Sequence, residues 1–168
     1  MRRPEGCWYA YTVGREVKDP TLDTNVTGYI ANGVWHHYLS TGDTGFLDHF
    51  WGVVEPAIDY VLSHQTGSGE IAWRGDDPGD GALLTGSSSL YASLKCAIAI
   101  AERLGRERPD WELSLGSLAI AVAHRPHVFL DKDRWAMDWY YPILGGVLRG
   151  QPAQMRVAAG WERFVVEG

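Results

Sequence analysis

Residues 22–65 constrain the fold of this chain more than any other stretch, because they read as two helices joined by a tight turn. Apolar and small side chains recur at intervals of three and four along residues 26–38, which predicts a helix with one buried face. Gly42 and Asp43 supply the turn, since glycine accepts a positive φ and aspartate accepts from the first N–H groups of the next helix. Two amphipathic helices joined this closely lie antiparallel.

The order of helix, tight turn, helix and long loop recurs along the chain. One hairpin cannot bury both of its faces, so stacked hairpins form a solenoid or close into a toroid. The sequence therefore predicts an all-α fold, with antiparallel helical hairpins forming about half of an (α/α)6 toroid. The predicted hairpins span about 24–64, 87–124 and 139–165.

Two positions determine where these helices are expected to start. Pro56 lacks a backbone N–H, which predicts a break in the second helix and a new start near Glu55. Ser88 or Ser89 is expected to cap the first helix of the second hairpin.

The composition of the sequence limits both the kind of protein and the kind of binding partner that we expect. The 168 residues are 45% hydrophobic with a mean hydropathy of −0.20, as in one ordinary globular domain. No apolar run approaches the roughly 20 residues that cross a bilayer, so we expect a cytoplasmic protein without a membrane span. The net charge of −6, without a cluster of basic residues, argues against nucleic acid. Cys7 and Cys96 lie far apart, and we expect no disulfide, metal or cofactor.

Several short segments resemble a known family. Asp23-Thr24-Asn25 before a helix of small residues, the turn Ser40-Thr41-Gly42-Asp43 and the loop Gln65…Gly69…Trp73 resemble a hairpin of the six-hairpin glycosidase superfamily, with the glucoamylase-like members closest. The resemblance is good over residues 22–73 and only architectural from there to residue 165. It implies a protein that acts on or binds a glycan. Those proteins are about twice this length, so we expect residues 1–168 to be a single partial domain, a fragment of a longer protein that is inactive alone.

A second resemblance keeps another function class open. The loop from Gln65 to Trp73 loosely resembles the QW repeat of terpene cyclases and prenyltransferases, and the whole chain resembles actinobacterial proteins labelled prenyltransferase. The spacing is longer than in that family, and no DxDD acid motif is present. A prenyltransferase-like toroid and a non-catalytic helical scaffold therefore remain alternatives. The expected partners are an oligosaccharide or small-molecule substrate, and either the remaining half of the toroid or a second copy bound through an exposed apolar edge.

The topology predicts where a site would lie. In a ring of hairpins the loops that enter the inner helices open at one end, which brings together Asp23, residues 85–89 and residues 138–140. Hydrolysis of a glycoside needs one carboxyl group with a raised pKa and one ionised carboxylate, and we predict Asp23 and Asp138 as this catalytic pair. Either could instead cap a helix. The residues predicted to bind substrate are Asn25, Trp73, Ser87, Trp135, Trp139 and Tyr140, although tryptophans more often belong to the core than to a binding wall.

Overall fold

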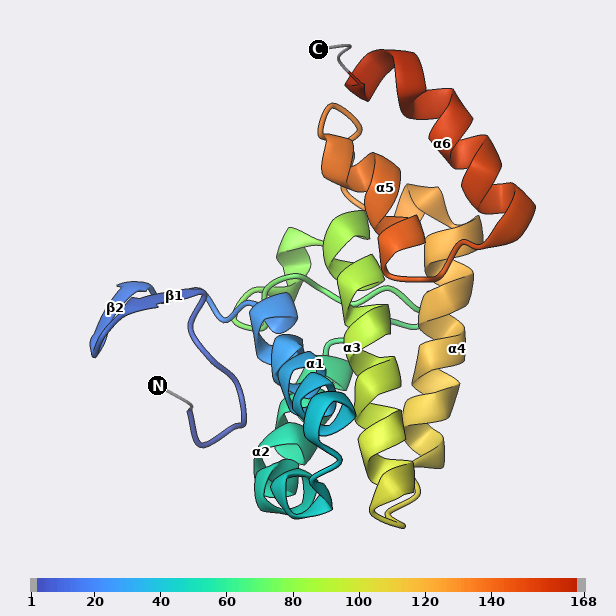
Figure 1. Ribbon diagram of the computed structural model, residues 1–168. Coiled ribbons are helices and arrows are strands. Elements are labelled where there is room, and N and C mark those ends of the chain that lie inside the picture. Colours follow the sequence, from blue (N-terminus) through green and yellow to red (C-terminus); the bar gives the residue numbers. More distant parts are fainter. Residues whose placement is uncertain (1–2, 166–168) are drawn as a thin grey trace.

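The computed structural model describes residues 3–165, which are predominantly helical (Figure 1). The described helices form consecutive antiparallel pairs, confirming the predicted all-α fold; the predicted domain limits at residues 1 and 168 lie outside the described part. The α-helices are α1 (Thr24–Thr41), α2 (Thr44–Leu62), α3 (Leu84–Arg103), α4 (Pro109–His124), α5 (Ala136–Leu144) and α6 (Gly150–Phe164), with short 3-10 turns at Pro78–Asp80 and Pro126–Val128.

The first helices of the three pairs lie side by side. α1 packs against α3, and α3 packs against α5, while α2, α4 and α6 each pack against the helix that precedes them. Figure 1 shows α1, α3 and α5 running in the same direction, so their N-terminal ends gather at one end of the molecule. This is the alternation of inner and outer helices expected for a toroid of hairpins, and it determines where the loops meet.

Glycines permit the inner helices to approach closely. A Cβ on Gly28 of α1 would lie 2.6 Å from Cδ2 of Leu90 on α3. A Cβ on Gly145, which follows α5, would lie 2.2 Å from the carbonyl oxygen of Ser88. A Cβ at Gly145 would push α3 away, because it would meet backbone, whereas a Cβ at Gly28 would require the end of the Leu90 side chain to move.

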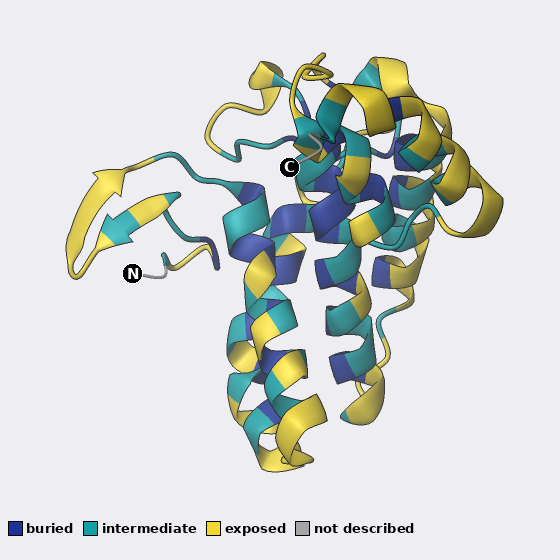
Figure 2. Ribbon diagram, turned by 45° about the horizontal axis from the view of Figure 1, so that its top comes forward, coloured by how far each residue is buried: buried dark blue, intermediate teal, exposed yellow. Residues whose placement is uncertain are grey.

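The main core lies between the first two hairpins. Leu47 and Ile58 of α2, Ile100 of α3 and Trp111 of α4 are almost completely buried. The rings of Trp51 and Trp111 lie 5.8 Å apart and join the outer helices α2 and α4. Figure 2 shows buried residues concentrated along the facing sides of the long helices.

The first turn forms as expected, and the second helix does not break. Gly42 has φ 71°, and Oδ1 of Asp43 accepts a hydrogen bond of 3.1 Å from the N–H of Phe46. α2 continues through Pro56, so the predicted new start near Glu55 is wrong. Val54 and Ile58, on either side of the proline, are buried in the same core, and their packing outweighs the hydrogen bond that proline removes.

The strand hairpin before α1 is mostly exposed. β1 (Tyr11–Val13) and β2 (Glu16–Asp19) form an antiparallel hairpin that extends away from the helices (Figures 1 and 2). In the part of the chain that the structure describes, no helix is both long and apolar enough to cross a membrane. The cytoplasmic location stays a prediction.

Candidate functional site

A cavity of about 430 Å³, called here the central cavity, lies where the inner helices begin. Its wall includes the starts of α1, α3 and α5 together with parts of the loop that follows α2. The predicted convergence of these loops is therefore present in the structure. The predicted site residues in this wall are Asp23, Asn25, Trp73, Trp135 and Asp138.

Asp23 is both a helix cap and part of the cavity wall. Its Oδ1 accepts a hydrogen bond of 3.0 Å from the N–H of Val26, in the first turn of α1. Burial raises the pKa of the Asp23 carboxyl group, and hydrogen bonds from the N–H groups of Val26 and Asn25 oppose that rise. The group therefore holds a proton at higher pH than an exposed aspartate does.

Asp138 is held by another inner helix. Only 9% of the residue is exposed, and its Oδ1 accepts a hydrogen bond of 2.6 Å from Oγ1 of Thr85, at the start of α3. Trp135, not Asp138, occupies the N-cap position of α5, so the alternative in which Asp138 caps this helix is wrong. A carboxylate has room for several hydrogen bonds, which leaves Asp138 able to accept from a ligand as well.

Asn25 presents an acceptor that the protein does not use. Its Oδ1 is buried and has no hydrogen-bond partner among the described residues. Asn25 also belongs to the wall of the central cavity, so its side chain lies beside the space where a ligand would bind, although this oxygen atom is itself covered.

The rest of the central cavity is mainly apolar. Trp135 is 51% exposed, and Met137 beside it also presents much of its surface to solvent. Leu83, Leu90 and Ile71 complete this apolar wall. Such a surface favours the C–H face or a methyl group of a ligand over its hydroxyl groups.

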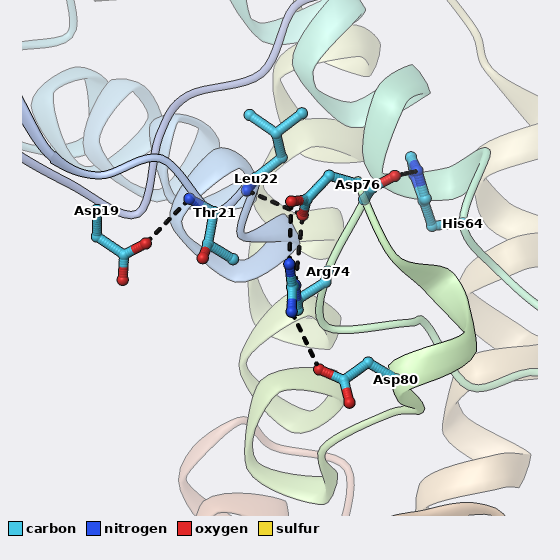
Figure 3. A network of polar contacts seen from close by, with 8 residues as sticks. Asp19, Thr21, Leu22, His64, Arg74, Asp76 and Asp80 are labelled. Carbon is cyan, nitrogen blue, oxygen red and sulfur yellow. Dashed lines mark hydrogen bonds and ion pairs between the residues drawn. The ribbon is translucent and has the colours of Figure 1, made fainter.

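A polar network holds the loop that carries Trp73 (Figure 3). Arg74 pairs with Asp76 and Asp80, and Oδ1 of Asp76 accepts from the N–H of Leu22 at 3.2 Å. The N–H of Thr24 donates to the Trp73 carbonyl at 3.1 Å, so this loop is fixed to the start of α1. The Arg74 guanidinium lowers the pKa of Asp76, which acts here as an ion-pair partner outside the cavity wall.

Three predicted binding residues lie elsewhere. Ser87 is buried within α3, where its Oγ accepts from the N–H of Ile71 at 3.4 Å, so it supports the loop. Trp139 lines a different cavity and stacks on Phe164 of α6. Tyr140 is 38% exposed and does not line the central cavity.

The helix starts explain these differences. α3 begins at Leu84, and Oγ of Ser88 donates to the Leu84 carbonyl within the helix, so the predicted serine cap is wrong. α5 begins at Ala136 rather than near residue 139. This start places Met137 and Tyr141, four residues apart, in the central cavity, where sequence reasoning did not expect them. Residues four apart lie on the same face of a helix, and this spacing of Met137 and Tyr141 was the signal in the sequence.

The solved structure of a rhamnosidase from Klebsiella oxytoca with rhamnose bound shares this arrangement of helices. The TM-score is 0.68 at 14% sequence identity, and the match covers 96% of this chain and 35% of the rhamnosidase. The chain thus has a glycosidase-like helical fold.

A curated relative is more similar in sequence. The chain is 46% identical over 169 residues to an MMP endo-(1,4)-3-O-methyl-alpha-D-mannosidase from Mycolicibacterium hassiacum, a match that covers 99% of this chain. The chain spans about half, 47%, of that protein's length. No protein-family model matches the chain. Both similar proteins are glycosidases, and neither supports the prenyltransferase alternative.

Proposed function

We propose that this chain forms a substrate-binding part of a glycoside hydrolase that acts on mannose-containing glycans. The observation that carries the proposal is the central cavity, where Asp23, Asn25 and Asp138 line one largely apolar space. Sugars present hydroxyl groups at the ring edge and C–H groups on the ring faces. Carboxylates and an amide bind the hydroxyl groups, and aromatic rings such as Trp135 bind the C–H faces.

The two carboxyl groups have different surroundings, which suits different roles. Asp23, whose pKa burial raises, is suited to donate a proton to a glycosidic oxygen. Asp138, oriented by the Thr85 hydroxyl, is suited to bind a sugar hydroxyl or to direct water. Because the chain matches about half of the mannosidase, we expect the 168 residues to bind a glycan weakly and to hydrolyse none on their own.

The apolar wall supports an O-methylated sugar as the ligand. A hydroxyl placed against Leu83 and Met137 would lose its hydrogen bonds to water without replacement, whereas a methyl ether gains from burial there. The name of the mannosidase relative specifies 3-O-methyl-mannose. The proposed ligand is accordingly a 3-O-methyl-α-D-mannoside.

Calorimetric titration tests this function. We expect saturable binding of methyl 3-O-methyl-α-D-mannoside, and weaker binding of methyl α-D-mannoside. Asn25→Ala and Trp135→Ala should each weaken binding about tenfold, equivalent to about 1.4 kcal/mol. Trp161→Ala is the matched control, because Trp161 is exposed on α6 and lies outside the cavity wall. No saturable binding by the folded protein would favour the scaffold alternative.

A further inference from the structure

A second cavity, called here the outer cavity, lies between α6 and the segment that precedes α5. Its volume is about 700 Å³. Its apolar wall comprises Phe129, Leu130, Trp139 and Phe164, and Ala159 of α6 faces the same space. The site described above does not use this space.

The two cavities meet at the start of α5. Asp138 and Lys132 belong to the walls of both. Each cavity alone falls within the range of about 300–1,000 Å³ that small-molecule sites occupy. A ligand that reached from the central cavity into the outer cavity would pass these two side chains.

Aromatic rings, one of them held by a hydrogen bond, form part of the wall of the outer cavity. The rings of Trp139 and Phe164 lie 5.4 Å apart with 23° between their planes. Nε1 of Trp139 donates to the Arg156 carbonyl at 2.7 Å, which fixes the indole ring. In return, the Arg156 guanidinium donates to the carbonyl oxygens of Trp139 at 2.8 Å and Asp138 at 2.6 Å. The contacts that orient the aromatic wall thus also hold the backbone of Asp138.

Polar groups flank this aromatic wall. Arg163 lies beside it and pairs with Asp133 at 3.2 Å. Asp131 also lines the outer cavity. An aromatic surface flanked by carboxylates and guanidinium groups matches the alternating apolar and hydroxyl surfaces of a sugar.

We propose that the outer cavity is a second sugar subsite, so that one oligosaccharide chain occupies both cavities and passes Asp138 and Lys132 between them. This inference rests on the proposed function and extends it, because it makes the ligand a stretch of polymer rather than a single sugar. A terminal sugar alone would fill only the central cavity.

The test compares ligand lengths on the full chain by calorimetry. The probes are a mono-, a di- and a tetrasaccharide of (1,4)-linked 3-O-methyl-α-D-mannose. We expect the tetrasaccharide to bind at least about tenfold more tightly than the monosaccharide. Ala159→Trp, which fills the outer cavity from exposed helix α6, should reduce tetrasaccharide affinity to the monosaccharide level and leave the monosaccharide unaffected. Ala158→Trp is the matched control, because Ala158 is exposed next to it without lining the cavity.

The outcomes separate this inference from the proposed function. Equal affinity for the monosaccharide and the tetrasaccharide overturns the second subsite and leaves the central site standing. An equal effect of the two tryptophan variants on the tetrasaccharide also overturns it. If no saccharide binds, the proposed function and the second subsite both fail. The length comparison in the unchanged protein decides the matter even if a variant does not fold.

Discussion

The first two hairpins and the third are held together by different forces. Helices α1 to α4 enclose an apolar core that includes Leu47, Ile100 and Trp111. In α6 only Gly160 is buried, and Trp161 is 53% exposed. Apolar burial therefore stabilises the first two hairpins much more than the third.

A side-chain hydrogen bond and the packing of α5 on α3 join the third hairpin to the others, and this hairpin supplies half of the candidate catalytic pair. Thr85 of α3 donates to the carboxylate of Asp138, and Arg156 of α6 donates to its carbonyl oxygen. Hydrogen bonds are directional and apolar burial is not, so these contacts fix the position of a side chain more closely than additional core would. On one side of the site an apolar core stabilises the fold, and on the other side hydrogen bonds fix the position of Asp138.

The largest expected effect is on the core of the first two hairpins. Trp111→Ala removes a fully buried ring and should lower the free energy of unfolding by about 3–5 kcal/mol. Trp161→Ala, on the third hairpin, should change it by no more than about 0.5 kcal/mol. Urea denaturation followed by circular dichroism measures both values. Similar costs at the two tryptophans would show that the hairpins are equally packed.

Loss of the Thr85 hydroxyl group should have the second largest effect on the free energy of unfolding. Thr85→Val leaves the nearly buried Asp138 carboxylate without its donor and should cost about 1.5–3 kcal/mol of unfolding free energy. Thr85→Ser keeps a hydroxyl group and is the control, with a smaller loss expected. Denaturation by urea gives both costs, and equal costs for valine and serine would indicate that the methyl group, rather than the hydrogen bond, matters here.

The junction of α5 and α6 provides a third test. A Cβ on Gly160 would lie 2.3 Å from Nε1 of Trp139, so Gly160→Ala should destabilise the protein by about 1–3 kcal/mol. Gly116→Ala is the matched control on α4, where a Cβ meets nothing within 4 Å, and it should stabilise by up to about 1 kcal/mol. Thermal unfolding distinguishes the signs. A neutral Gly160→Ala would mean that the third hairpin shifts freely.

The smallest expected effect is the change of folding stability with pH that the Asp23 carboxyl group causes. Its pKa is higher in the folded protein than in the unfolded chain, so the unfolded chain loses this proton first and folded stability falls as pH rises from about 4. Asparagine caps a helix about as well as aspartate. Asp23→Asn should therefore match the parent near pH 3 and be slightly more stable near pH 7. Urea denaturation across this range checks the sign, and a less stable variant at neutral pH would contradict it.

Local sequence signals predicted the first hairpin and the place of the site. The turn at Gly42 and Asp43 depends on φ and on one side-chain hydrogen bond, both encoded within a few residues. The convergence of Asp23, Asn25 and Asp138 follows from hairpin topology alone. Neither prediction needed knowledge of distant packing.

The remaining site residues depended on helix starts that the sequence does not mark. α3 follows Leu83 and α5 follows Trp135, and neither start carries a side-chain cap. An error of one residue in helical register turns a side chain by about 100°. Ser87 and Trp139 were consequently expected at the cavity that Met137 and Tyr141 line.

The close contacts at Gly28 and Gly145 also determine the curvature of the whole assembly. The bulky rings of Trp51 and Trp111 lie between the outer helices, whereas at the inner helices Gly28 faces the Leu90 side chain and Gly145 faces the Ser88 carbonyl. The first two hairpins thus lie closer together at their inner helices than at their outer ones, and hairpins spaced in this way follow an arc around the central cavity. A methyl group added at Gly145 would meet the Ser88 backbone and push α5 from α3, which would flatten that arc and move Asp138 away from Asp23, although it touches neither residue.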